Sequence, residues 1–277
     1  MGYKTILTVL TDTNQQAQLE AAVTIARQHD AHLDVFCLAV DHTQSGFYYA
    51  GASAYVFQAA IEAAMETARE LEDWAKARLE GSGVRYAVES AVAQGGGLAT
   101  LVAMRARFCD LAVMNRPYDG NYGADRESVV EGARFDGICP VLIVPAQVPE
   151  RLGQRILVAW NQSNEALAAI RRALPLLCAA DHVEITVIDP SPHSPERAEP
   201  GKALARMLSR HGVKAEIAVL ARTQSQISAI LMQRATEIGA DMVVMGAYGQ
   251  SRLREAILGG ATRDLLEGTS VPIFMAR

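Results

Sequence analysis

The feature that most constrains the fold of this chain is a series of strand-like and helix-like segments that occurs twice. Three stretches of the second half resemble stretches of the first half and follow one another in the same order. Residues 155–160, 235–245 and 269–275 echo residues 4–10, 107–114 and 137–143. Three echoes in one order indicate an internal duplication, so each half is expected to fold in the same way.

Within each half, short apolar runs rich in β-branched residues alternate with amphipathic stretches. The strand-like runs of the first half are residues 6–10, 33–40, 86–92, 111–114 and 140–144. The helix-like stretches between them are residues 15–28, 56–79, 98–106 and 128–133. This alternation predicts parallel sheets covered by helices on both faces. We therefore predict an α/β protein with two tandem doubly wound, Rossmann-like domains at residues 1–149 and 150–277, with a linker at 145–154.

Composition excludes several classes of partner and location. Of the 277 residues half are hydrophobic, and the net charge of −5 argues against a nucleic acid or a membrane surface as partner. No apolar run approaches the roughly 20 residues that span a bilayer, and the amino terminus lacks the pattern of a signal peptide. The four cysteines are far apart in the sequence and form no Cys-x-x-Cys pair, which favours buried free thiols and a cytoplasmic location.

A glycine-bearing segment in the second half is the main candidate for a binding site. The apolar run 241–245 is followed by Gly246 and Gly249, and a helix-like stretch is preceded by Gly259 and Gly260. Glycines let a backbone approach a ligand closely, and the free N–H groups of a helix start suit an anion such as phosphate. No lysine follows these glycines, so the segment is not a Walker loop.

At these residues the chain resembles the universal stress protein family, whose nucleotide-binding members carry Gly-x-x-Gly, nine residues, and then Gly-Ser or Gly-Thr. Gly246, Gly249 and Gly259 match the three glycines, whereas Gly260 stands where the family usually has the hydroxyl residue. The resemblance implies an α/β fold that binds ATP, ADP or AMP, with Mg²⁺ left open. The alternative for the glycines is a turn and a helix cap without a ligand.

The resemblance also implies contacts to the nucleoside. Family members commonly place an aspartate just past the first strand, and the aligned residue here is Asn161, which can contact the nucleoside or start a helix turn with Ser163. The family reads adenine through backbone groups near the end of the second strand, which falls at about Val187.

Three further residues are candidates for the phosphate end of the ligand. Arg252 lies between the glycines, where it is either a phosphate ligand or a solvated side chain. The amide of Ala261 is expected to contribute to an anion cradle, and Thr262 supplies the missing hydroxyl or is an ordinary helical threonine.

The first half lacks these features. After its fourth strand the sequence Asn115-Arg-Pro117 has no Gly-x-x-Gly, and Pro117 removes an N–H that a phosphate cradle needs. We therefore predict an adenine-nucleotide-binding stress-response or regulatory protein with its site in the second half. Little or no turnover is expected, at most that of a slow ATPase, because no general base and no Walker lysine can be identified. The alternative is a non-nucleotide scaffold or a sensor of a small lipid or metal ligand.

Association with other chains is a separate question. The two halves are expected to form a pseudo-dimer within the chain. Five aromatic residues within residues 47–57 favour a lid over a crevice or the contact of a homodimer, and the alternative is a loop folded over its own core.

Overall fold

A computed structural model describes residues 2–41, 54–94, 96–117, 123–149, 151–190, 198–246, 266 and 269–276. The chain forms two compact units, which divide between Val141 and Leu142. The boundary that we predict after residue 149 lies a short way beyond this division and remains a prediction.

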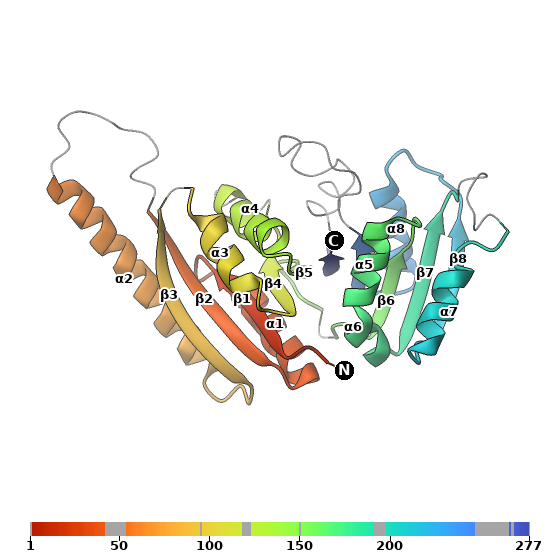
Figure 1. Ribbon diagram of the computed structural model, residues 1–277, viewed down its shortest axis with the longest axis horizontal. Coiled ribbons are helices and arrows are strands. Elements are labelled where there is room, and N and C mark those ends of the chain that lie inside the picture. Colours follow the sequence, from red (N-terminus) through yellow and green to blue (C-terminus); the bar gives the residue numbers. More distant parts are fainter. Residues whose placement is uncertain are drawn as a thin grey trace. The chain divides into compact units, whose positions relative to one another are not determined.

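Strands and helices alternate in both units, as the sequence predicts (Figure 1). The elements of the first half are β1 (Thr5–Leu10), α1 (Gln16–His29), β2 (His32–Asp41), α2 (Ala54–Leu79), β3 (Arg85–Gln94), α3 (Leu98–Ala106), β4 (Leu111–Asn115), α4 (Gly123–Glu131), η2 (Gly132–Asp136) and β5 (Val141–Val144). Those of the second half are β6 (Arg155–Ala159), α5 (Asn164–Arg172), α6 (Leu174–Ala179), β7 (His182–Ile188), α7 (Lys202–Arg210), β8 (Ala215–Leu220), α8 (Ile227–Glu237), β9 (Met242–Gly246) and β10 (Ile273–Ala276).

The first four strands of each half form a parallel sheet with the same order. In the first unit the order is β3-β2-β1-β4, and Ile6 of β1 lies between Leu33 and Leu111. In the second unit the order is β8-β7-β6-β9-β10, with Ile156 between Val183 and Met242. The first strand of each half therefore lies near the middle of its sheet, and the predicted α/β fold with doubly wound parallel sheets is confirmed.

Helices cover both faces of the first sheet. Successive residues of a strand point to opposite faces. Ser90 of β3 donates a short hydrogen bond to Glu72 of α2, whereas its neighbour Glu89 forms an ion pair with Arg105 of α3. The helices α2 and α3 therefore lie on opposite faces. The edge strand β3 is mostly exposed or half-buried, whereas the central strands are buried. β1, for example, is buried from Ile6 to Leu10.

The internal duplication recurs in individual hydrogen bonds. The carboxylate of Asp110, just before β4, accepts hydrogen bonds from the backbone amides of residues 4–5 at 2.7 and 3.0 Å. Asp241, just before β9, accepts from the amides of residues 153–155 at 3.0 to 3.1 Å. In both halves one aspartate thus fixes the start of the first strand beside the start of the fourth.

Some local predictions differ from the structure. The helix predicted at residues 128–133 begins earlier, at Gly123. The α-helix α4 ends at Glu131, and the chain continues in the wider helical turn of η2. Cys37 and Cys139 are buried free thiols as expected, but Cys178 is exposed. Of the aromatic segment, residues 47–53 lie outside the described part of the chain, and only the helical backbone is described for residues 54–57.

Candidate functional site

The carboxyl ends of the central strands are where open parallel sheets bind ligands. We call the space at the ends of β1 and β4 the first crevice, and the corresponding space at the ends of β6 and β9 the second crevice. The two crevices occupy equivalent places in the duplicated halves, so their residues can be compared directly.

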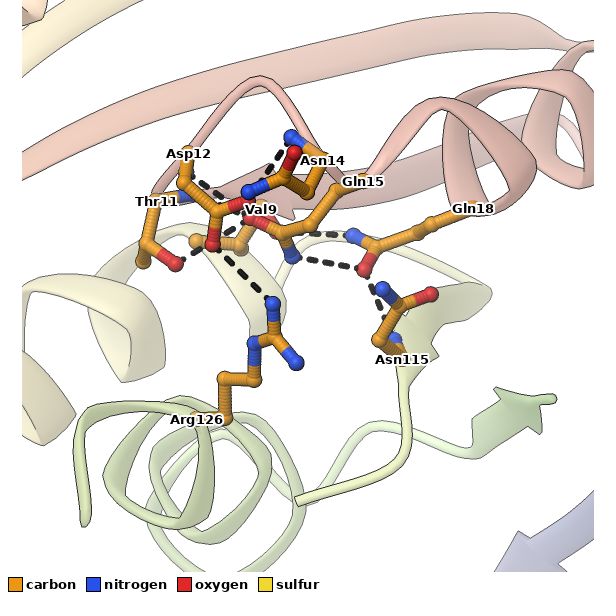
Figure 2. A network of polar contacts seen from close by, with 8 residues as sticks. All are labelled: Val9, Thr11, Asp12, Asn14, Gln15, Gln18, Asn115 and Arg126. Atoms are coloured by element: carbon orange, nitrogen blue, oxygen red, sulfur yellow. Dashed lines mark hydrogen bonds and ion pairs between the residues drawn. The ribbon is translucent and has the colours of Figure 1, made fainter. Parts of the chain in front are cut away.

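Two glutamines from α1 and the turn before it fill the first crevice (Figure 2). The Oε1 atom of Gln15 accepts hydrogen bonds from the amides of Thr11 and Asp12 at 2.6 and 3.0 Å. Its Nε2 atom donates to Oε1 of Gln18 at 2.8 Å, and Nε2 of Gln18 donates to the carbonyl of Val9 at 2.7 Å. Both glutamine side chains are buried, at 3% and 0% exposure, so the backbone ends of β1 already have protein partners.

The same network closes the crevice toward β4 and α4. The amide of Asn115, at the end of β4, donates to Oε1 of Gln18 at 2.7 Å, and Arg126 of α4 forms an ion pair with Asp12 at 3.0 Å (Figure 2). The cavity that remains has a volume of about 10 Å³, which is room for about one water molecule. Among the described residues, the first crevice therefore leaves no cavity large enough for a nucleotide, in agreement with the absence of Gly-x-x-Gly from the sequence of this half.

Gln15, Gln18 and Arg126 are functional-site residues that none of the sequence motifs above includes. The signal that could have found the glutamines is a pair of long polar side chains spaced i, i+3 on the same stripe of α1 as Leu19 and Ala22, which are buried. Arg126 gives no such signal, because a helical arginine three residues after the helix start is usually solvated.

The second crevice has a different construction around Gly246, the last residue of β9. A Cβ atom at this position would lie 2.3 Å from the backbone nitrogen of Ala166 and 2.6 Å from the carbonyl carbon of Glu165. The first turn of α5 thus lies directly against the end of β9, and only glycine permits this approach. Gly246 therefore has a packing role in the described structure, and it also brings the amino end of a helix to the crevice.

Asn161 follows β6 and starts the turn into α5. Its Oδ1 atom accepts a hydrogen bond from the amide of Ser163 at 3.1 Å, and Oγ of Ser163 accepts from the amide of Ala166 at 3.1 Å. Ser163 is thus the N-cap of α5, as the sequence predicts. Asn161 itself is exposed, so its interpretation as the start of a helix turn is supported, and contact with a nucleoside remains a prediction.

The other predicted site residues fall into two groups. Val187 lies in β7, one residue before the end of the strand, with its side chain 3% exposed and its backbone opposite Val219 of β8. The remaining six lie outside the described residues, and these are Gly249, Arg252, Gly259, Gly260, Ala261 and Thr262. The structure therefore brings Asn161 and Gly246 to one crevice and leaves the phosphate end of the predicted site untested.

Comparison of the two crevices shows which side chains differ. The backbone amide of Asp110 donates a hydrogen bond to the carbonyl of Thr5, and the amide of Asp241 donates one to the carbonyl of Arg155. Thr5 and Arg155 are therefore equivalent positions of the two halves. The residue equivalent to Gln18 is then Ala168, whose side chain cannot reach across the crevice. If residues are counted from the first residue of α1 and of α5 instead, the equivalent of Gln18 is Ala166, again an alanine.

The strongly shifted titratable groups lie away from both crevices. Burial raises the pKa of the Cys37 thiol to about 12, and burial likewise raises the pKa of Cys109 to about 12. In the described ranges no group of three or more His, Cys, Asp or Glu side chains is arranged to hold a metal ion. Within the same ranges no helix has the length and apolar character needed to cross a bilayer.

The described residues form two doubly wound α/β units in tandem, one with a filled crevice and one with a helix start against a strand-end glycine. The model of the universal stress protein family matches residues 153–277. Residues 153–277 therefore form a domain of the universal stress protein family, and the first half repeats the same fold.

Individual relatives agree with this assignment. A universal stress protein from Archaeoglobus fulgidus DSM 4304 has the same fold over both halves, with 17% identity, coverage of 99% of this chain and 98% of that chain, and a TM-score of 0.75. Universal stress protein Slr1230 from Synechocystis is 22% identical over 163 residues, which are 57% of this chain and 52% of that protein. The match thus spans about half the length of that relative.

Nucleotide binding occurs among the solved members of the family. A universal stress protein in complex with cAMP is 17% identical to this chain and covers 53% of it, with 100% of its own length. Its TM-score of 0.37 is too low to carry an argument about the ligand of this chain.

Proposed function

We propose that this chain is a stress-response or regulatory protein that binds an adenine nucleotide, ATP or its products ADP and AMP, in the second half only. The observation that carries the proposal is the difference between the two crevices. Gln15, Gln18 and the Asp12–Arg126 pair fill the first crevice, whereas an alanine replaces Gln18 in the second.

The local backbone of the second crevice supports an anionic ligand. The N-terminus of α5 lies against the end of β9, and the positive end of a helix dipole favours negative charge. The glycines that follow in sequence, Gly249 and Gly259, provide backbone amides without side chains in the way. Arg252, Gly260, Ala261 and Thr262 are the proposed neighbours of the phosphates, with Mg²⁺ as a candidate companion ion.

The role of the bound nucleotide is proposed to be regulatory, with slow hydrolysis or none. The sequence has no Walker lysine after its glycines, so the outer phosphates lack the cation that ATPases use. In this proposal the bound nucleotide stabilises the second crevice.

The test is direct identification of the ligand. Protein purified without added nucleotide is denatured with acid, and the released small molecules are separated and identified by mass. We expect ATP, ADP or AMP, and isothermal titration with ATP in the presence and absence of Mg²⁺ gives the affinity of the stripped protein. Release of a lipid or a metal instead, with no heat on titration, would establish the alternative of a non-nucleotide sensor.

Matched variants locate the site. Gly249→Val and Gly259→Val should each weaken ATP binding at least about tenfold, because the added side chain keeps a phosphate from approaching the backbone. Gly120→Val makes the same change after the fourth strand of the first half and should leave the affinity unchanged. Equal losses in all three variants would place the site elsewhere.

A further inference from the structure

The first unit exposes large apolar side chains at the end of the sheet opposite to its crevice. Met104 and Phe108, at and just after the end of α3, are 56% and 81% exposed. Phe135 and Ile138, at and just after the end of η2, are 39% and 69% exposed. We call these four residues the α3 patch.

The two segments that carry the α3 patch pack against each other. A Cβ atom on Gly137 would lie 2.8 Å from Cβ of Ala106, and Sγ of Cys139 lies 3.5 Å from the carbonyl oxygen of Cys109. With about 200 Å² for each full side chain, the patch exposes on the order of 500 Å² of apolar surface. The largest apolar patch on a folded monomer is typically of this size, and it is often a functional surface.

A groove of about 220 Å³ lies directly beside the patch, between α3 and the strands β2 and β3. Met104 and Phe108 form one wall, and Phe36 and Glu89 are among the residues of the other. The guanidinium of Arg105 lies 4.9 Å from the centre of the Phe36 ring. The α3 patch therefore combines a projecting aromatic ring with a hollow that has an aromatic wall.

The rim of the groove carries charges of both signs. Arg105 and Glu89 form an ion pair at 2.5 Å with side chains 48% and 56% exposed, so each remains accessible to a partner. Asp34 adds a second carboxylate, whose pKa is raised mainly by burial and further by the neighbouring Glu89, while His32 and Arg105 oppose the shift. Two carboxylates beside one guanidinium disfavour a nucleic acid or an anionic lipid, because either partner needs clustered cations.

We propose that the α3 patch is a self-association surface, which pairs with the α3 patch of a second copy of this chain about a two-fold axis. In a two-fold interface the same surface must complement itself. Phe108 of each copy enters the groove of the other, and Glu89 of one copy faces Arg105 of the second.

The four apolar side chains expose on the order of 500 Å², so a symmetric dimer also needs the polar rim to complete its interface. A stable interface buries about 800 Å² on each partner, with an apolar centre and a polar rim. The four apolar side chains supply the centre, and Arg105, Glu89 and Asp34 supply the rim. The surface belongs to the first unit and lies at the opposite end of the strands from the first crevice, so it is independent of nucleotide binding in the second half.

Sedimentation velocity of the full chain over a concentration series tests the proposal. We expect the wild type to dimerise, and Phe108→Ser and Met104→Gln to raise the dimer dissociation constant at least about tenfold. Met65→Gln is the matched control, because Met65 on α2 is 43% exposed and lies outside the patch. All of these side chains are exposed, so circular dichroism should show unchanged folds.

A mixing experiment separates the contact between chains from the ion pair within one chain. Glu89→Arg and Arg105→Glu should each abolish the homodimer through like charges across the axis. An equimolar mixture should form a heterodimer, because both facing pairs then have opposite signs. A role confined to the single chain predicts no rescue on mixing.

Three results would overturn the proposal. These are a wild type that stays monomeric at the highest concentrations, a dimer that Phe108→Ser leaves unchanged, and charge variants that do not recover on mixing. None of the measurements depends on nucleotide, so stripped protein can be used throughout. A failure here therefore leaves the proposed nucleotide site untouched, and a failure of nucleotide binding leaves the dimer untouched.

Discussion

Gly246 illustrates at the scale of a single residue how one position serves two purposes. The sequence suggests a ligand loop, since Gly246 is the first glycine of the pattern Gly-x-x-Gly. The structure adds a packing reason, because the backbone of Glu165 and Ala166 occupies the space of a side chain. The first half has Asn115 at the end of its fourth strand, and there Gln18 contacts the backbone of the strand in place of a helix start.

Gly246→Ala should therefore destabilise the second unit whether or not a nucleotide is present. The added Cβ meets backbone atoms that cannot move alone, and overpacking of this kind costs about 1–3 kcal/mol. Urea denaturation of the stripped protein measures the loss. Gly97→Ala is the control, since its Cβ would lie 3.3 Å from one carbonyl and should cost less than about 1 kcal/mol. An equal cost for both variants would contradict the packing role.

At the scale of an element, the position of α8 depends on a buried ion pair with β7. Arg234 of α8 donates two hydrogen bonds to Glu184 at 2.6 and 2.9 Å, and Thr186 donates a third at 2.9 Å. The Glu184 side chain is only 4% exposed. Burial acts to raise the pKa of Glu184, but the hydrogen bonds from Arg234 and Thr186 outweigh it and hold the pKa below its usual value.

Arg234→Gln should lower the free energy of unfolding by about 3–5 kcal/mol at neutral pH, because it leaves a buried carboxylate without its cation. Because the pKa of Glu184 is lower in the folded state, its ionised form stabilises the fold at pH values above about 4.3, the pKa of the unfolded chain. This stabilisation is lost as the pH falls through the pKa of the folded state. The difference between wild type and variant should therefore shrink below about pH 4. Urea denaturation of wild type and variant, at neutral pH and again below about pH 4, measures this difference in the free energy of unfolding.

The control for this element is Arg206→Gln, a change of the same charge on the exposed face of α7. It should alter stability by less than about 0.5 kcal/mol at either pH. A loss for Arg234→Gln that is no larger than this, or one that grows on acidification, would contradict the role of the ion pair.

At the scale of the whole molecule, duplication has been followed by divergence of the crevices. Asp110 and Asp241 perform the same task in each half, so the strand framework is retained. The first crevice is filled by its own glutamines, and that half needs no ligand to satisfy its strand ends. We expect such a division of labour to appear as a ligand response in one half only.

Hydrogen exchange measured by mass spectrometry can read the two halves separately. Saturating ATP should slow exchange in peptides that cover residues 155–165 and 242–246, because the proposed ligand lies at the ends of β6 and β9. Peptides that cover residues 5–15 and 111–117 are the internal control and should not change. Protection of the first-half peptides would contradict the assignment of the site.

The sequence by itself determined the alternation of strands and helices, the duplication and the family pattern of the second half. These features depend on local periodicity and on glycine spacing, which are written in consecutive residues. Ser163 as the cap of α5 was predictable for the same reason, since an N-cap acts within its own turn.

Only the tertiary structure decided what fills the first crevice and where the α3 patch lies. Gln18 is close to Asn115 only because β1 and β4 are neighbours in the sheet, and Ala106 lies against Gly137 only because the ends of α3 and η2 pack together. These contacts join residues far apart in the sequence, so no local pattern records them. The physical reason is that side-chain burial and pairing depend on the packing of whole elements, which a residue's own neighbours do not specify.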